Sequence, residues 1–245
     1  MLSKSIVKYI QSLGHKKFRD EAGVFVAEGP KIINEFLNNP EVVIEQWYAT
    51  PEWIRESQHL LRDNKPVEIE AQDLQRISQL ATPNQVLAVV RQFRKAENQR
   101  TDQRGLILCL DAIQDPGNMG TIVRIADWFG VHHIVCGKSC ADLYNPKVVQ
   151  ATMGSIARVA VYYEELTAWL NRQTGRRIYG AVLDGRDIRQ LGKLQDGILV
   201  IGNESKGIHP DLMAKVNVRV TIPKLGEADS LNAAVATGII LSHIT

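Results

Sequence analysis

The sequence has little cysteine, with only three thiols in 245 residues. So sparse and odd a set argues against a disulfide framework and favours a reducing compartment. No run reaches the roughly 18 uninterrupted apolar residues that a membrane span needs. The first ten residues also lack the apolar stretch and small-residue cleavage site of a secretory signal. We therefore expect a cytoplasmic protein without a membrane partner.

The sequence also lacks the motifs of several common enzyme classes. No Gly-x-Gly-x-x-Gly follows an expected strand, which argues against a dinucleotide-binding fold and against Rossmann-like methyltransferases. A Walker A sequence and a Gly-x-Ser-x-Gly elbow are absent too. His132, His133, Cys136 and Cys140 span a predicted strand and its exit at spacings unlike those of zinc sites. We expect no metal.

Charge is nearly balanced overall, with a formal net charge of +2, but it is unevenly distributed. Residues 1–19 contain five cations and no acidic residue, and a mixed but basic stretch follows at 91–104. Such clusters can neutralise the phosphates of a polyanion. Composition alone favours the alternative of a solvated helix face and a charged linker. The cations of the first cluster are Lys4, Lys8, Lys16, Lys17 and Arg19.

Hydrophobic patterning divides the chain near residue 100. Residues 1–95 alternate short apolar runs with amphipathic stretches and predict a small α/β domain, whereas 96–104 is polar and predicts a linker. Residues 105–245 alternate buried strands with helices, which indicates a mostly parallel sheet covered on both faces. The expected strands are 24–27, 42–48, 67–69, 85–90, 105–110, 133–136, 158–162, 177–182, 198–202 and 216–222. The expected helices are 4–13, 31–37, 52–62, one from 73, 118–129, 146–153, 165–173, 210–215 and 230–241.

Three strand-to-helix junctions in the second half place glycines or small polar residues where an α/β fold presents backbone N–H groups to a ligand. The first is Asp115-Pro116-Gly117, a turn signal, followed by Asn118 as the expected N-cap of a helix. The apolar positions of that helix share one face and turn Arg124 away from it. The alternative is that Arg124 forms a surface ion pair with Asp127.

The second junction is a buried strand that ends in a loop bounded by Gly202 and Gly207. Glu204 in this loop could instead cap the helix expected near His209, or pair with Lys206. The third junction leads from Ile222-Pro223 through a glycine-containing loop to Ser230-Leu231-Asn232. Taken alone, Ser230 would be an ordinary N-cap of a helix formed by the small residues that follow it.

The order and the residues of these junctions resemble the three motifs of the SpoU/TrmH-type RNA ribose 2'-O-methyltransferases of the knotted SPOUT superfamily. In the first half, Phe18-Arg19 and the run from Gly23 to Lys31 are similar to the start of the ribosomal-protein-like substrate-binding domain of many members. The sequence departs from the family pattern at Lys224, Gln150 and Ser242-His243, which puts substrate contacts in question more than chemistry.

The resemblance implies that the chain transfers a methyl group from S-adenosylmethionine to a ribose 2'-hydroxyl. Arg124 would assist deprotonation of that hydroxyl, Asn118 and Asn232 would orient the ribose and Arg124, and Glu204 and Ser230 would hold the arrangement. The cofactor would be bound at Leu183, Gly202, Asn203, Glu204, Gly207, Ile222, Leu231 and Asn232. RNA would be bound at Lys16, Lys17, Arg19, Lys31 and Arg124.

The resemblance further implies a C-terminal trefoil knot and a homodimer with the pocket at its interface. A separate N-terminal domain favours ribosomal RNA over transfer RNA, and no DNA partner is expected. Two alternatives stay open: a SPOUT enzyme that methylates a nucleobase, and an RNA-binding assembly factor without catalysis. The sequence does not say which nucleotide is modified.

Overall fold

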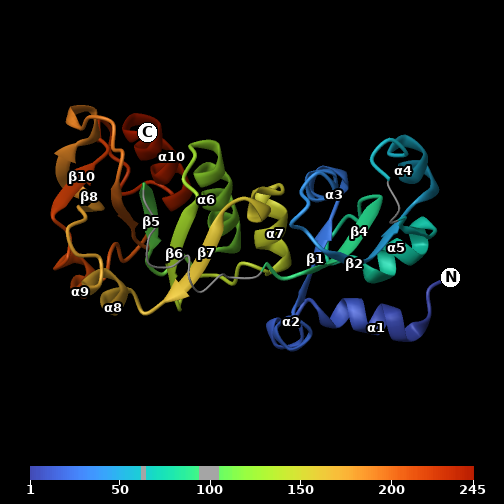
Figure 1. Ribbon diagram of the computed structural model, residues 1–245. Helices are drawn as coiled ribbons and strands as arrows, with labels where there is room; N and C mark the ends of the chain where they lie inside the picture. Colours follow the sequence, from blue (N-terminus) through green and yellow to red (C-terminus); the bar gives the residue numbers. More distant parts are fainter. Residues whose placement is uncertain (62–64, 94–104) are drawn as a thin grey trace. The chain divides into compact units, whose positions relative to one another are not determined.

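The computed structural model describes residues 1–61, 65–93 and 105–245 (Figure 1). It contains two compact units, of which unit 1 is Met1–Arg94 together with Asp142–Ala157, and unit 2 is Lys95–Ala141 together with Arg158–Thr245. Residues 142–157 thus pack with the N-terminal part of the chain, although unit 2 precedes and follows them in sequence. The predicted linker 96–104 lies outside the described residues.

Unit 1 is built on a mixed four-stranded sheet of order β1-β4-β2-β3. β4 is antiparallel to both β1 and β2, while β3 runs parallel to β2. Successive residues of β1 face opposite sides, so Val26 packs with Ile10 and Leu74 on one side while Phe25 meets Phe36 on the other. The elements are α1 (Lys4–Ser12), α2 (Lys16–Ala22), β1 (Val24–Glu28), α3 (Pro30–Leu37), β2 (Ile44–Ala49), α4 (Pro51–Glu56), β3 (Val67–Glu68), α5 (Ala71–Ile77), β4 (Val86–Arg91), α7 (Pro146–Thr152) and a 3-10 turn at Ser155–Ala157.

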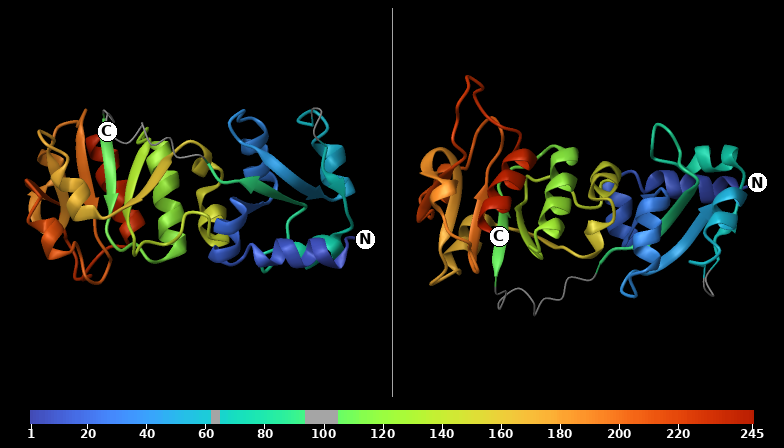
Figure 2. Two further views of the ribbon diagram at one scale, coloured as in Figure 1. Left: turned by 60° about the horizontal axis from the view of Figure 1, so that its bottom comes forward. Right: turned by 90° about the horizontal axis from the view of Figure 1, so that it is seen from above.

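Unit 2 is built on a six-stranded sheet of order β10-β8-β9-β5-β6-β7 in which every neighbouring pair is parallel. Cys109 and Val200 pack with Trp169 and Leu212 of α8 and α9. α6 and α10 pack against each other and run side by side in light green and red in Figure 2. The elements are β5 (Leu106–Leu110), α6 (Pro116–Trp128), β6 (His133–Gly137), β7 (Ala160–Glu164), α8 (Leu166–Asn171), β8 (Ile178–Asp187), a 3-10 turn at Ile188–Gln190, β9 (Gly197–Ile201), α9 (Pro210–Met213), β10 (Val218–Thr221) and α10 (Ala233–Ile244).

The predicted fold class is confirmed: a parallel α/β domain follows a small α/β domain. Several local predictions are wrong. α6 begins at Pro116, so Asp115 and not Asn118 is its N-cap, and α10 is capped by Asn232 and not by Ser230. β8 continues five residues beyond the predicted end at Val182. α2 is not predicted at all, because its sequence has no apolar periodicity.

In the three described ranges, no helix is both long enough and apolar enough to cross a bilayer.

Candidate functional site

The three junctions meet at one edge of the unit 2 sheet. β10, β8, β9 and β5 are consecutive neighbours and all parallel, so their carboxyl ends lie together. The loops that leave this edge are 111–115 after β5, 202–209 after β9 and 222–232 after β10. The sequence segments that resemble the three family motifs are therefore adjacent in the fold.

The first loop fixes the start of α6. Asp115 is the N-cap, and its Oδ1 accepts a hydrogen bond of 2.8 Å from the backbone N–H of Asn118. Pro116 occupies the first helical turn, where a missing N–H loses no helical bond. This cap orients Asn118 at the edge of the sheet, on the first turn of the helix.

Asn118, at the start of α6, joins the helix that follows the first loop to the second and third loops. Its Nδ2 donates to Oε1 of Glu204 at 2.5 Å, and its Oδ1 accepts from Nδ2 of Asn232 at 2.8 Å. Oδ1 of Asn232 in turn accepts from the first N–H groups of α10. Glu204 is thus held by Asn118, while α9 is capped by His209. We call Asn118, Glu204 and Asn232 the motif triad.

The second loop is held closed by its own backbone. Asn203 and Gly207 exchange two backbone hydrogen bonds of 3.1 and 2.8 Å, and Gly207 has a φ of 68°. A Cβ on Gly202 would lie 2.3 Å from the carbonyl carbon of Gly207, so no other residue fits there. The Asn203 side chain accepts from two N–H groups of the loop and donates to the Ala112 carbonyl at 3.0 Å. Asn203 therefore shapes the loop with its side chain.

The remaining predicted cofactor residues also lie at this edge. Thr221, the last residue of β10, donates its hydroxyl to the Leu183 carbonyl at 3.1 Å, which joins Leu183 to the position just before Ile222. The side chains of Leu183 and Leu231 are exposed although apolar, and Leu225 is 98% exposed. Glycine backbone, apolar side chains and a carboxylate suit an adenosyl ligand with a polar ribose. Among the described residues no group of three or more His, Cys, Asp or Glu could hold a metal ion.

Arg124 lies on the solvent-facing side of α6. It is exposed, and within the described part of the chain its side chain makes no hydrogen bond or ion pair. The alternative of an ion pair with Asp127 is wrong, because Arg158 holds that carboxylate at 2.8 Å. The structure does not connect Arg124 to the motif triad. Ser230 is likewise exposed and unbonded within the described residues.

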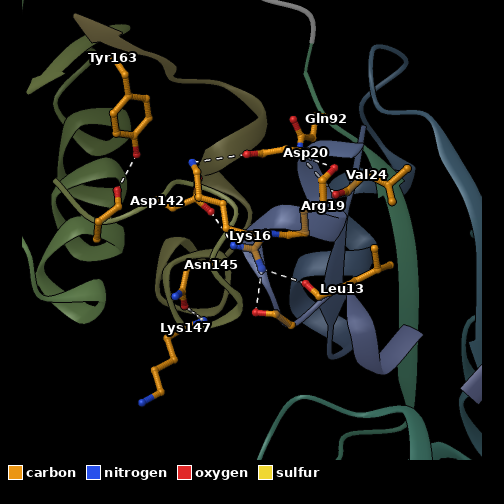
Figure 3. A network of polar contacts seen from close by, with 12 residues as sticks. Leu13, Lys16, Arg19, Asp20, Val24, Gln92, Asp142, Asn145, Lys147 and Tyr163 are labelled. Carbon is orange, nitrogen blue, oxygen red and sulfur yellow. Dashed lines mark hydrogen bonds and ion pairs between the residues drawn. The ribbon is translucent and has the colours of Figure 1, made fainter. Parts of the chain in front are cut away.

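The cations predicted to bind RNA in unit 1 have different environments. Lys16, Lys17 and Lys31 are exposed, and Phe18 beside the first two is 42% exposed. Arg19 is only 2% exposed, and its guanidinium donates to backbone carbonyls and to Asp142 (Figure 3). The guanidinium of Arg19 therefore has no free face for a phosphate in this structure.

Sequence reasoning missed two residues that shape the site. Asp115 reads as part of a turn, but an aspartate directly before Pro-Gly is also an N-cap signal. Ala112 has a φ of 55°, a left-handed conformation that costs a residue with a Cβ roughly 1–2 kcal/mol. No sequence signal marks that position, since left-handed residues are usually glycine, asparagine or aspartate.

Comparisons with known proteins agree with the geometry. Residues 105–242 match the SpoU rRNA Methylase family, and residues 4–88 match the MRM3-like substrate binding domain. The chain is 29% identical over 241 residues to the 23S rRNA (guanosine(2553)-2'-O)-methyltransferase RlmP of Bacillus subtilis strain 168, covering 97% of this chain and 95% of the relative.

Several solved structures match almost the whole chain, and two of them follow. A TrmH-family protein from Porphyromonas gingivalis has a TM-score of 0.85 and 38% identity, covering 99% of this chain and 98% of the other. An rRNA methyltransferase from Sinorhizobium meliloti, solved with bound AdoMet, has a TM-score of 0.85 and 30% identity, covering 99% and 95%.

Proposed function

The chain belongs to the SpoU rRNA methylase family, and on that basis we propose that its substrate is a ribose 2'-hydroxyl of ribosomal RNA. As a member, it is an RNA 2'-O-ribose methyltransferase that depends on S-adenosylmethionine. The observation that carries the proposal is the motif triad, in which Asn118 hydrogen-bonds to both Glu204 and Asn232. This contact joins the three loops into one site.

S-adenosylmethionine supplies an electrophilic methyl group when bound. Four of the residues predicted to bind it lie in one loop, whose backbone a ligand can approach closely: Gly202, Asn203, Glu204 and Gly207. Leu183, Ile222 and Leu231 supply apolar contact, and Asn232 a side-chain amide.

Arg124 activates the ribose hydroxyl. A hydroxyl attacks poorly until its proton is drawn away. An arginine stays protonated at neutral pH, so Arg124 acts by electrostatic stabilisation of the developing oxyanion more readily than as a base. Arg124 is exposed and has no partner in the part of the chain that the structure describes, so its guanidinium is available for an RNA phosphate or hydroxyl. Asn118 and Asn232 orient the ribose, while Glu204 and Ser230 hold the site.

Unit 1 binds the RNA. Lys16, Lys17 and Lys31 offer exposed cations for phosphates, and Phe18 offers an exposed ring on which an unpaired base can stack. Arg19 is omitted from this surface because it is buried. Docking of folded ribosomal RNA on this unit selects the substrate. The three cysteines are buried free thiols, which accords with a cytoplasmic location.

A second copy of the chain covers α6 and α10. α10 is apolar around most of its circumference, yet Val235 is 51% exposed, and Trp128 on the neighbouring α6 is 83% exposed. Arg124 shares the solvent-facing side of α6 with Trp128, so a dimer through these helices would bring Arg124 to the partner's surface. We also propose that the C-terminal part of this chain forms the trefoil knot that is typical of the family.

The test is methylation of ribosomal RNA taken from cells that lack the protein, using S-adenosylmethionine labelled in its methyl group. We expect label at a nucleotide whose 3' phosphodiester resists alkali, because a methylated 2'-hydroxyl cannot attack that bond. Label at a position that alkali still cleaves would indicate a nucleobase product. Saturable RNA binding without cofactor binding in calorimetry would indicate an assembly factor.

A further inference from the structure

The first loop of the candidate site is fixed firmly to the core of unit 2. The Asp111 N–H donates to the Ile201 carbonyl at 2.9 Å, which continues the pairing of β5 with β9. Cys140 holds both sides of the turn that follows, because its Sγ donates to the Leu110 carbonyl at 3.2 Å and accepts from the Ile113 N–H at 3.3 Å. Leu110 and Ile113 are fully buried. The first loop therefore offers a fixed base to its neighbours.

The second loop has fewer attachments of its own. It leaves β9 at Gly202 and enters α9, a helix of only four residues, after His209. The residues at its tip are exposed, and the hydrogen bonds of Asn203 within the loop close it on itself. Internal hydrogen bonds fix the shape of a loop but not its placement. The placement of the second loop therefore depends on bonds to the elements beside it.

Two such bonds join the second loop to the first, one near each end. Nδ2 of Asn203 donates to the Ala112 carbonyl at 3.0 Å, and Oδ2 of Asp111 accepts from the His209 N–H at 2.7 Å. Asp111 and Ala112 are adjacent in the fixed loop, whereas their partners lie at opposite ends of the other. Glu204, which donates its carboxylate to the motif triad, lies between those two ends. The two bonds thus hold the second loop on both sides of Glu204.

The bond from His209 to Asp111 is the stronger of the two. A carboxylate that accepts from a backbone N–H forms a charge-assisted hydrogen bond, which is shorter and stronger than a bond between two neutral amide groups. His209 also begins α9, because its Nδ1 accepts from the Asp211 N–H at 3.3 Å. Asp111 therefore fixes the point at which the second loop ends and the next helix begins.

We propose that Asp111 is a positioning residue for cofactor binding: its carboxylate holds the far end of the second loop at His209, so that the loop presents its backbone to S-adenosylmethionine. Within the described residues, Asp111 makes no side-chain hydrogen bond to the motif triad, so it acts through His209. The inference rests on the proposed function, in which the second loop binds the cofactor.

The first test is calorimetric titration of Asp111→Ala with S-adenosylmethionine. We expect Kd to rise at least tenfold, because the second loop is no longer held at His209. Asp111→Asn keeps a side-chain oxygen for the same N–H and should recover most of the affinity. Glu165→Ala is the matched control, because that carboxylate also accepts from backbone N–H groups of unit 2, those of Thr167 and Ala168, but does not contact the second loop.

His209→Pro breaks the same bond from the donor side. It removes the backbone N–H, and the φ of −56° at this position already suits proline. His209→Ala is its control, since both variants lose the side-chain cap of α9 but only His209→Pro loses the N–H. Kd should rise in His209→Pro and stay near the wild-type value in His209→Ala. The double variant with Asp111→Ala should bind no more weakly than the weaker single variant, because both changes remove one bond.

Thermal unfolding separates placement from stability. Glu165→Ala should lower the unfolding midpoint and keep the wild-type Kd, so an equal loss of affinity in Glu165→Ala and Asp111→Ala would overturn the inference. Wild-type Kd in Asp111→Ala or in His209→Pro, measured well below the unfolding midpoint, would overturn it as well. If Asp111→Ala does not fold, the comparison of His209→Pro with His209→Ala decides. Wild-type affinity in Gly202→Ala, which alters the second loop itself, would count against the proposed role of that loop instead.

Discussion

In unit 1 the charged side chains nearest the core are hydrogen-bonded within the unit, whereas Arg124, the cation that the proposed reaction needs in unit 2, lies at the surface. Arg19, Glu28 and Asp73 are buried, and each is hydrogen-bonded within the unit. Arg124 is exposed and has no partner in the described residues. A buried charge without a partner is strongly destabilising, so unit 1 has to satisfy its charges.

The largest apolar side chains in the core of unit 1 also differ from two exposed ones of unit 2. The aromatic cluster of Phe25, Phe36, Phe93 and Tyr144 is packed inside unit 1. In unit 2, Trp128 is 83% and Leu225 98% exposed. Large exposed apolar side chains are candidates for a ligand or partner surface. Substitutions in the core of unit 1 should therefore act first on stability, and those at the unit 2 loops and at α6 and α10 first on function.

The largest effect is expected for Arg124→Ala. Turnover should fall about a thousandfold, about 4 kcal/mol in the barrier, because the group that stabilises the developing oxyanion is removed. The thermal unfolding midpoint should not change, since no contact inside the described chain is lost. Single-turnover methylation and calorimetric unfolding measure the two quantities. Arg172→Ala removes an exposed arginine of the same unit and should leave turnover unchanged; equal loss in both variants would refute a specific role for Arg124.

Gly202→Ala should weaken binding of S-adenosylmethionine about a hundredfold. The added methyl group would meet the Gly207 backbone at 2.3 Å, and a backbone cannot yield as a flexible side chain can. The second loop must then open, and the backbone that it presents to the cofactor is displaced. Calorimetric titration measures the affinity. Gly192→Ala is the control, because a Cβ there meets nothing within 4 Å; wild-type affinity in Gly202→Ala would show that the closed loop is not needed.

The sequence predicts the fold well where one local rule dominates. Apolar runs such as 198–202 identify strands of the parallel sheet, because a strand buried on both faces needs apolar side chains at every position. Periodicity does not predict α2. The position of this helix depends on hydrogen bonds from Arg19 to three groups, one of which is 123 residues away in the sequence. For the same reason the sequence predicts that Arg19, which lies close to two lysines, belongs to a basic surface, although it is buried in the structure.

The site is predicted in part. Asn118, Glu204 and Asn232 meet as the family resemblance implies, but their mutual hydrogen bonds depend on strand order, which is not encoded in any single segment. Ser230 reads as the better cap because serine precedes a run of small residues, yet the helix begins two residues later at Asn232. Residues 142–157 lie within 105–245 in sequence, and only long-range packing assigns them to unit 1. The knot stays a prediction.

Val235→Asp tests whether the exposed apolar surface of unit 2 is covered by a second copy. We expect the dimer dissociation constant to rise at least tenfold, because an unpaired carboxylate would have to be buried at the interface. Methylation should fall with the dimer fraction, while the cofactor loops remain intact. Analytical ultracentrifugation over a concentration series gives the constant. Val67→Asp, at a residue 54% exposed in unit 1, is the matched control; equal sedimentation of the two variants would argue against a dimer through α10.

The smallest effect is expected for Glu28→Gln in unit 1. Burial is the main influence on this carboxyl and raises its pKa, although hydrogen bonds from Ser78 and Gln79 favour the charged form. The folded state therefore holds this proton more tightly than the unfolded state. Its contribution to stability is full below the unfolded pKa and is lost as the pH rises through the raised folded pKa.

Glutamine at position 28 keeps an acceptor for the Gln79 N–H and has no charge to bury. At pH 7 we expect the free energy of unfolding to rise by no more than about 1 kcal/mol, and the loss of stability between acidic and neutral pH to become shallower than in the wild type. Urea unfolding at several pH values measures both, with Glu45→Gln as the exposed control. A less stable variant at neutral pH would mean that the ionised carboxylate, held by Ser78 and Gln79, stabilises unit 1 despite its burial.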